Sequence, residues 1–193
     1  MKPVSGLTLV ELLIAISVAS ITLSVAIPSF STLIMNSERT ANIAALQTAV
    51  SLARSEAVKR GYRVSLCRSD NPDAATPCAS GSNWADGWIL YTDRDGNGQP
   101  ETSAEILLAH PAINDAADAS LIGSGTLADR LEYLANGHLS VAVGPNDKII
   151  RCDKRGYQSA RAIHISSSGR VGLRSHDSAT DPVQSGDCAQ DGG

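Results

Sequence analysis

The chain has 193 residues, a formal net charge of −4, and a composition that is 42% hydrophobic, 19% charged and 4% aromatic. This length leaves room for one domain and an appendage. The charge and composition exclude a globally basic nucleic-acid binder and a highly charged disordered chain. A mean hydropathy near zero excludes a protein with several membrane spans.

Residues 12–37 form an apolar run of 26 residues without a single charge. As a helix this run would extend about 39 Å, which exceeds the roughly 30 Å hydrocarbon core of a bilayer. The run is too long for a secretory signal peptide, and no small-residue cleavage site follows it. We therefore predict a transmembrane anchor, with the end that carries Lys2 in the cytoplasm.

Glu11 lies at the edge of this apolar run. A carboxylate one turn inside an apolar helix costs about 2.5–3.5 kcal/mol on insertion scales, so it needs a partner or a helix end. Cleavage after Gly6 would create an α-amino group at Leu7, four residues before Glu11. That amine could neutralise Glu11 within the chain or in a packed neighbour.

The segment Gly6–Leu13 (GLTLVELL) resembles the class III leader and first residues of type IV pilins and type II secretion pseudopilins. The resemblance implies that a prepilin peptidase cuts after Gly6 and methylates Leu7, where the family usually has Phe. It also implies that Glu11 guides filament assembly and that Pro28 kinks the helix.

From Glu38 onward the helical pattern becomes amphipathic. Steps of 3, 4, 3 and 4 place Ile43, Leu46, Val50, Ala53 and Ala57 on one face. Gly61 is a suitable stop, so the helix is predicted from about Leu7 to Arg60.

The stretch Leu52–Arg60 is similar to the "ARSEAV" signature of the GspH/FimT branch, which contains pseudopilin H and FimT/FimU-type minor pilins. The resemblance implies two packed sheets beside the helix.

After Gly61 the apolar period changes to two, and turn residues separate short strand-like runs. We predict strands within 62–67, 88–92, 106–109, 131–134, 138–143, 148–152, 162–165 and 171–174. The fold class is α+β, with a long N-terminal helix on antiparallel sheets. The expected organisation is a leader (1–6), a transmembrane half-helix (7–35), a periplasmic domain (36–176) and a C-terminal surface tail (177–193).

All four cysteines follow the apolar run and none has C-x-x-C spacing, which favours disulfides outside the cytosol. Three pairings are possible. We favour Cys67–Cys78, which closes a Pro/Ala/Ser loop, and Cys152–Cys188, which fastens the tail to a strand. The loop-entropy relation gives them about 3 and about 4 kcal/mol.

The segment Asp93–Gly98 (DRDGNG) has oxygen ligands at alternate positions, as calcium loops do, but no acid at the twelfth position. A hairpin turn is therefore the favoured interpretation. The histidines lack ligand spacing, and no nucleophile–base–acid set is present. We expect no enzyme, no metal and no cofactor.

Residues 148–176 hold seven cations against one acid, which leaves a net charge of +6 in this region. Five of the seven are arginines, which suit bidentate phosphate contacts. The set could hold a phosphate backbone without reading sequence; its members are Lys148, Arg151, Lys154, Arg155, Arg161, Arg170 and Arg174.

The segments Cys152–Gly156 and Gly169–Arg174 also resemble the C-terminal part of FimT-type minor pilins, some of which bind DNA through a G-R-x-R element. We therefore predict a minor pilin or pseudopilin that primes a pilus or type II secretion filament. A DNA-uptake pilin with a basic face is the alternative. The expected partners are other pilin subunits, prepilin peptidase, an inner-membrane assembly platform and membrane lipid along residues 7–35.

Overall fold

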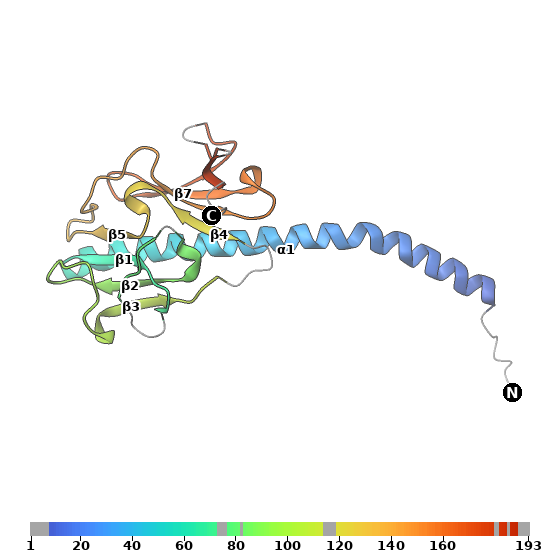
Figure 1. Ribbon diagram of the computed structural model, residues 1–193, viewed down its shortest axis with the longest axis horizontal. Coiled ribbons are helices and arrows are strands. Elements are labelled where there is room, and N and C mark those ends of the chain that lie inside the picture. Colours follow the sequence, from blue (N-terminus) through green and yellow to red (C-terminus); the bar gives the residue numbers. More distant parts are fainter. Residues whose placement is uncertain are drawn as a thin grey trace. The chain divides into compact units, whose positions relative to one another are not determined.

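The computed structural model describes residues 8–72, 77–81, 83–113, 119–179, 182–184 and 186–188. The chain divides into two compact units, one ending at Glu38 and one from Arg39 onward. The helix α1 (Leu9–Arg60) begins in the first unit and ends in the second. The two units are described separately below (Figure 1).

The domain from Arg39 contains two four-stranded antiparallel sheets. Sheet one has the order β3-β2-β1-β5 and sheet two has the order β4-β6-β7-β8. The strands are β1 (Val64–Arg68), β2 (Trp88–Thr92), β3 (Ile106–His110), β4 (Ser120–Gly123), β5 (Arg130–Tyr133), β6 (Lys148–Cys152), β7 (Arg161–Ile165) and β8 (Val171–Ser175). Four short 3-10 turns, η2 (Trp84–Asp86), η3 (Ser103–Glu105), η4 (Gly125–Leu127) and η5 (Tyr157–Ser159), lie between strands.

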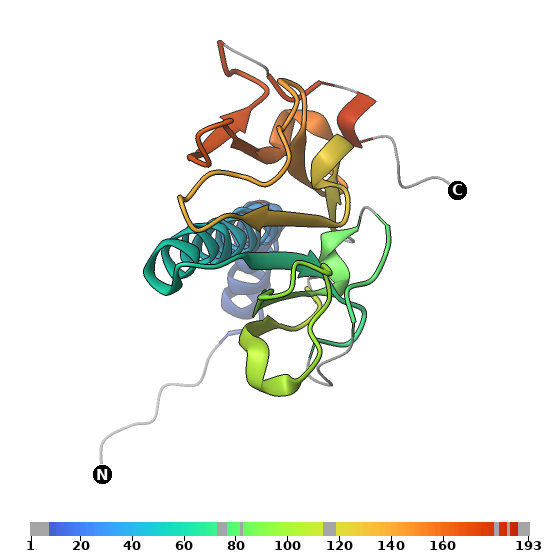
Figure 2. The same ribbon diagram turned by 90° about the vertical axis from the view of Figure 1, so that its left-hand side faces the viewer.

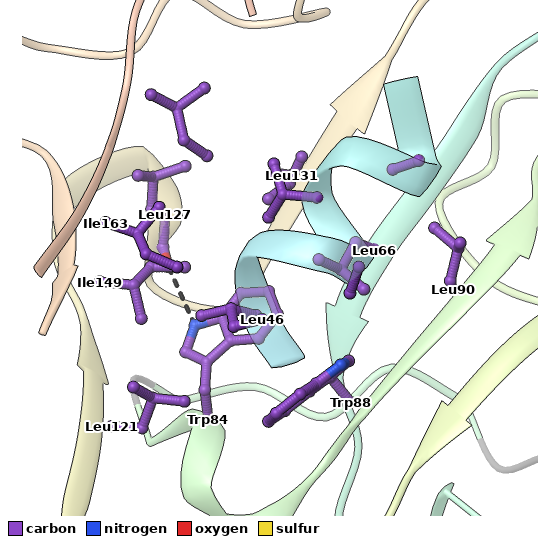
Figure 3. Close-up of a cluster of buried hydrophobic side chains, with 14 of the residues drawn as sticks. Leu46, Leu66, Trp84, Trp88, Leu90, Leu121, Leu127, Leu131, Ile149 and Ile163 are labelled. Atoms are coloured by element: carbon purple, nitrogen blue, oxygen red, sulfur yellow. Dashed lines mark hydrogen bonds between the residues drawn. The ribbon is translucent and has the colours of Figure 1, made fainter. Parts of the chain in front are cut away.

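The second half of α1 supplies one wall of the main core. Ile43, Leu46, Val50, Ala53 and Ala57 are all buried, as the helical spacing predicts. They belong to one cluster with apolar side chains from both sheets (Figure 3). A single stripe of the helix is thus covered by both sheets, which Figure 2 shows from the end of the domain.

Two polar side chains tie the sheets together inside this core. The Trp84 indole nitrogen donates to the carbonyl oxygens of Leu127 (3.1 Å) and Ala128 (2.9 Å), the first of which is drawn in Figure 3. The Tyr133 hydroxyl, on sheet one, donates to the Gly169 carbonyl oxygen in the β7–β8 turn of sheet two (2.9 Å). These bonds satisfy polar atoms whose burial would otherwise cost free energy.

A second core lies on sheet two. Ile150, Cys152, Ala160 and Ala162 are buried together with Val183 from the C-terminal segment. The Val183 amide donates to the Ser175 carbonyl oxygen at 3.2 Å. Val183 therefore packs into the domain as part of its core, whereas the sequence predicted a surface tail here.

The strand predictions contain one omission and one error. Residues 120–123 form β4, a strand that the sequence pattern did not predict. Residues 138–143 form no strand, although Leu139 makes an isolated bridge to Tyr133. The other seven predicted strands are present within one or two residues of their expected ends.

Candidate functional site

The first unit presents apolar side chains on every side of the helix. Those with large exposed fractions include Leu9 (75%), Ile14 (60%), Ile21 (69%), Ile27 (65%) and Phe30 (64%). Within the described residues, α1 is the one helix long and apolar enough to cross a membrane, and its most apolar window is fully exposed. A helix that is apolar all round is stable when lipid or other protein surrounds it.

Four hydroxyl groups within this apolar half donate to carbonyl oxygens of the helix itself. The Ser17 and Ser20 hydroxyls donate to the carbonyl oxygens of Leu13 and Ile16, both at 2.7 Å. Those of Thr22 and Ser24 likewise bond to carbonyls one turn back. Each polar side chain that forms such a bond can enter hydrocarbon without an unpaired hydrogen-bonding group.

Glu11 sits in the first turn of α1, where Thr8 caps the helix. The Glu11 amide donates to the Thr8 hydroxyl oxygen at 3.2 Å. The pair matches the Ser/Thr-x-x-Glu pattern of capping boxes, in which the acid also favours the positive end of the helix dipole. Our sequence reasoning missed this cap, although the spacing of Thr8 and Glu11 could have revealed it.

The two processing residues, Gly6 and Leu7, lie outside the described residues. Pro28 lies inside α1, which runs without a break from Leu9 to Arg60. The role of Pro28 in assembly stays a prediction.

Both predicted disulfides are present. Cys67 and Cys78 are bonded, with a Cα–Cα distance of 5.6 Å, and Cys152 and Cys188 are bonded, with a Cα–Cα distance of 5.7 Å. The second bond links β6 to the C-terminal segment that carries Val183. This disulfide therefore holds the C-terminal segment over the second core.

The seven cations of the predicted DNA-binding set do not form one exposed face. The Lys148 side chain is only 6% exposed and its amino nitrogen lies 3.0 Å from the Asp187 carboxylate. The Arg151 side chain is fully buried and lies 3.6 Å from the Asp153 carboxylate. For these two residues the prediction of DNA contact is wrong, because sheet two encloses them.

The other five cations differ in their exposure. Lys154 and Arg170 are exposed, whereas Arg155, Arg161 and Arg174 are half-buried. Arg155 forms two hydrogen bonds with the Asp153 carboxylate, at 2.9 and 2.6 Å. Burial alone would raise the pKa of Asp153, but the hydrogen bonds and charges of Arg155 and the charge of Arg151 lower it below its ordinary value.

The Asp93–Gly98 segment is the connection that leaves β2 toward β3. The Asp93 side chain is buried, and its carboxylate accepts the Gly96 amide at 2.8 Å. Gly96 and Gly98 both have positive φ, at 76° and 77°, which glycine adopts without strain. The geometry is that of a turn stabilised by its own aspartate, and no metal-binding group of three or more His, Cys, Asp or Glu occurs among the described residues.

These observations define a class of protein: a chain with a long N-terminal helix, apolar enough in its first half to cross a membrane, and an α+β domain, as in type IV pilins. The family model for the type II transport protein GspH matches residues 42–169. The prokaryotic N-terminal methylation motif matches residues 1–27. The chain therefore belongs to the GspH family.

The solved structures support the same fold. The crystal structure of the type IV minor pilin FimU from Pseudomonas aeruginosa, in space group P21, superposes with a TM-score of 0.53 and 22% sequence identity. The alignment covers 73% of this chain and 91% of FimU. Among curated proteins, no sequence matches this chain.

Proposed function

We propose that this protein is a structural, assembly-priming subunit of a type IV pilus or type II secretion filament. The observation that carries the proposal is the first half of α1, which is apolar on all sides and opens with Glu11, whose amide donates to the Thr8 hydroxyl oxygen. Among the described residues of the first unit, no other element covers this helix, so lipid covers it before assembly and neighbouring helices cover it afterwards.

The proposal includes processing and location. Prepilin peptidase cleaves after Gly6, and the new amine at Leu7 is methylated. The N-terminus faces the cytoplasm and the domain faces the periplasm, in agreement with its two disulfides. N-terminal sequencing of the protein from its native envelope should begin at Leu7. A start at Met1 would contradict the proposal.

Substitution of Glu11 by Val tests the role of this carboxylate in assembly. We expect about a tenfold or greater loss of the subunit from purified filaments, since a charged hydrogen bond contributes about 1.5–3 kcal/mol. Glu56→Gln is the matched control, because Glu56 pairs only locally with Lys59 and Arg60 later in the same helix. Normal incorporation of the Glu11→Val protein would refute the role.

DNA capture is the rival function, and the structure leaves it fewer cations than the sequence suggested. Lys154 and Arg170 are the exposed members of the set, and Arg170 lines a cavity of about 290 Å³ with Arg54. Gel shifts with duplex DNA over a salt series test this function. DNA capture requires a log–log salt slope of about −0.9 for each neutralised phosphate, which Arg170→Glu would reduce.

A further inference from the structure

Four arginines from different elements gather around one carboxylate in the domain. Arg39 comes from α1, Arg151 from β6, Arg155 from the turn after β6, and Arg161 from β7. Asp153 is the shared carboxylate: it contacts Arg151 and Arg155, and its charge acts on Arg39. The group, which we call the arginine cluster, carries three more positive charges than negative ones.

The Asp153 carboxylate forms ion pairs with two of these four arginines. Its side chain is 1% exposed and lies 3.6 Å from Arg151 and 2.6 Å from Arg155. Arg39 and Arg161 instead donate to backbone carbonyl oxygens, those of Ser159 and Ala160. Within the described residues neither of the two forms a salt bridge, and the Arg39 Nε atom is buried without a hydrogen-bond partner.

The positive charge around Arg39 is therefore only partly compensated. Burial, Arg161 and Arg155 lower the pKa of the Arg39 guanidinium, and Asp153 is the one carboxylate among the groups that act on it most strongly. Nearby positive charges that lower the pKa of an arginine also favour the binding of an anion beside it.

A cavity of about 290 Å³ opens beside these two arginines. It is lined by Arg39 and Arg161, by Thr40 and Gln47, and by the apolar residues Ile43, Ala44 and Leu173. Leu173 is 49% exposed, although it lies on β8 beside the buried core. The cavity thus offers two cations and an apolar wall to one ligand.

The position of Arg39 in the sequence indicates which anion it meets. Arg39 is the second residue after the uncharged run 12–37, whose roughly 39 Å length exceeds a hydrocarbon core of about 30 Å. Phosphate headgroups lie at this depth, and anionic headgroups attract cations next to a membrane-spanning helix.

From these observations we propose that the cavity between Arg39 and Arg161 binds the phosphodiester headgroup of an anionic phospholipid, with the first carbons of an acyl chain against Ile43 and Leu173. Arginine suits this ligand because its planar fork can hold two phosphate oxygens. Bound lipid would hold the domain against the bilayer until assembly removes the subunit. The inference rests on the membrane anchorage in the proposed function, but not on filament formation.

Native mass spectrometry of the full, delipidated protein in detergent tests the proposal, with phosphatidylglycerol and phosphatidylcholine as probes. The wild-type protein should bind phosphatidylglycerol about tenfold more tightly than phosphatidylcholine. Arg39→Gln/Arg161→Gln should lose this preference. Lys154→Gln/Arg170→Gln removes the same charge from exposed positions and should keep it.

Four results would overturn the proposal: equal binding of the two lipids, a preference that survives Arg39→Gln/Arg161→Gln, its loss in the control variant, or displacement of the lipid by duplex DNA at equal phosphate concentration. Displacement by DNA would indicate a nucleic-acid site instead. If the double variant fails to fold, Leu173→Glu places an acid at the same cavity from an exposed strand position and should also abolish the preference. The Glu11→Val protein should bind lipid normally, which separates this site from the assembly role.

Discussion

The two units of the chain use apolar residues in opposite ways. In residues 8–38 most of the large apolar side chains around α1 are exposed, with Met35 as a buried exception, whereas in residues 39–60 one stripe of the same helix is buried. Both stretches belong to one continuous α-helix. The difference shows that secondary structure does not decide the role of an apolar helix. What packs against its apolar surface decides whether the helix suits an anchor or a domain core.

The comparison predicts where stability resides. All three buried apolar clusters consist of residues from Ile43 onward, as do both disulfides. Both tryptophans of the chain, Trp84 and Trp88, are fully buried in the main cluster. Tryptophan fluorescence during urea unfolding therefore reports on the domain alone. It measures the free energy of unfolding on which the predictions below depend.

The largest expected effect comes from Asp153→Ala. This change removes a buried carboxylate that lies 3.6 Å from the Arg151 guanidinium and 2.6 Å from that of Arg155, which should lower the free energy of unfolding by about 3–5 kcal/mol. Urea unfolding of the purified protein measures the change. Glu56→Ala removes a carboxylate from a local helical ion pair and should have a far smaller effect. Equal effects of the two variants would show that the Asp153 pair is not structural.

The two leucines Leu46 and Leu13 test the comparison most directly. Leu46→Ala leaves a cavity in the main core and should lower the free energy of unfolding by about 2–5 kcal/mol. Leu13→Ala removes the same atoms from an exposed position in the first unit and should change it by less than about 0.5 kcal/mol. A comparable loss from Leu13→Ala would mean that the first unit contributes to the stability of the domain.

The smallest effect concerns pH and Asp153. Its pKa is lowered in the folded domain, so its stabilisation is complete above the unfolded value of about 3.9 and is lost as the pH falls through the lower folded value. The free energy of unfolding should therefore decrease from pH 5 toward pH 2, and Asp153→Asn should flatten this decrease. Asp147, whose pKa is also lowered, keeps part of the slope in that variant. An unchanged slope in Asp153→Asn would contradict the assignment.

The sequence predicted the helical face and most strands because their periodicity reflects burial by one large partner. It failed at residues 120–123 and 138–143, where pairing with other strands decides the outcome. Ser120–Gly123 is short and has no apolar alternation, yet it pairs along its whole length with β6. Residues 138–143 alternate well, but only their first half bonds to β5, through the Ser140 amide and the Glu132 carbonyl oxygen at 2.9 Å.

The amino-acid sequence by itself predicted the apolar run, the cleavage motif, the amphipathic half of the helix and the favoured one of three disulfide pairings, since each prediction depends on local spacing or on a count of residues. Tertiary structure alone decided which basic side chains are exposed, because burial and pairing depend on residues far apart in the chain. Lys148 meets Asp187 only after the C-terminal segment folds over sheet two, and Arg161 meets Arg39 only after the helix packs. A count of charges along the chain predicted one basic face; the fold instead buried two of its members and placed Arg155 and Arg161 beside an arginine of the helix.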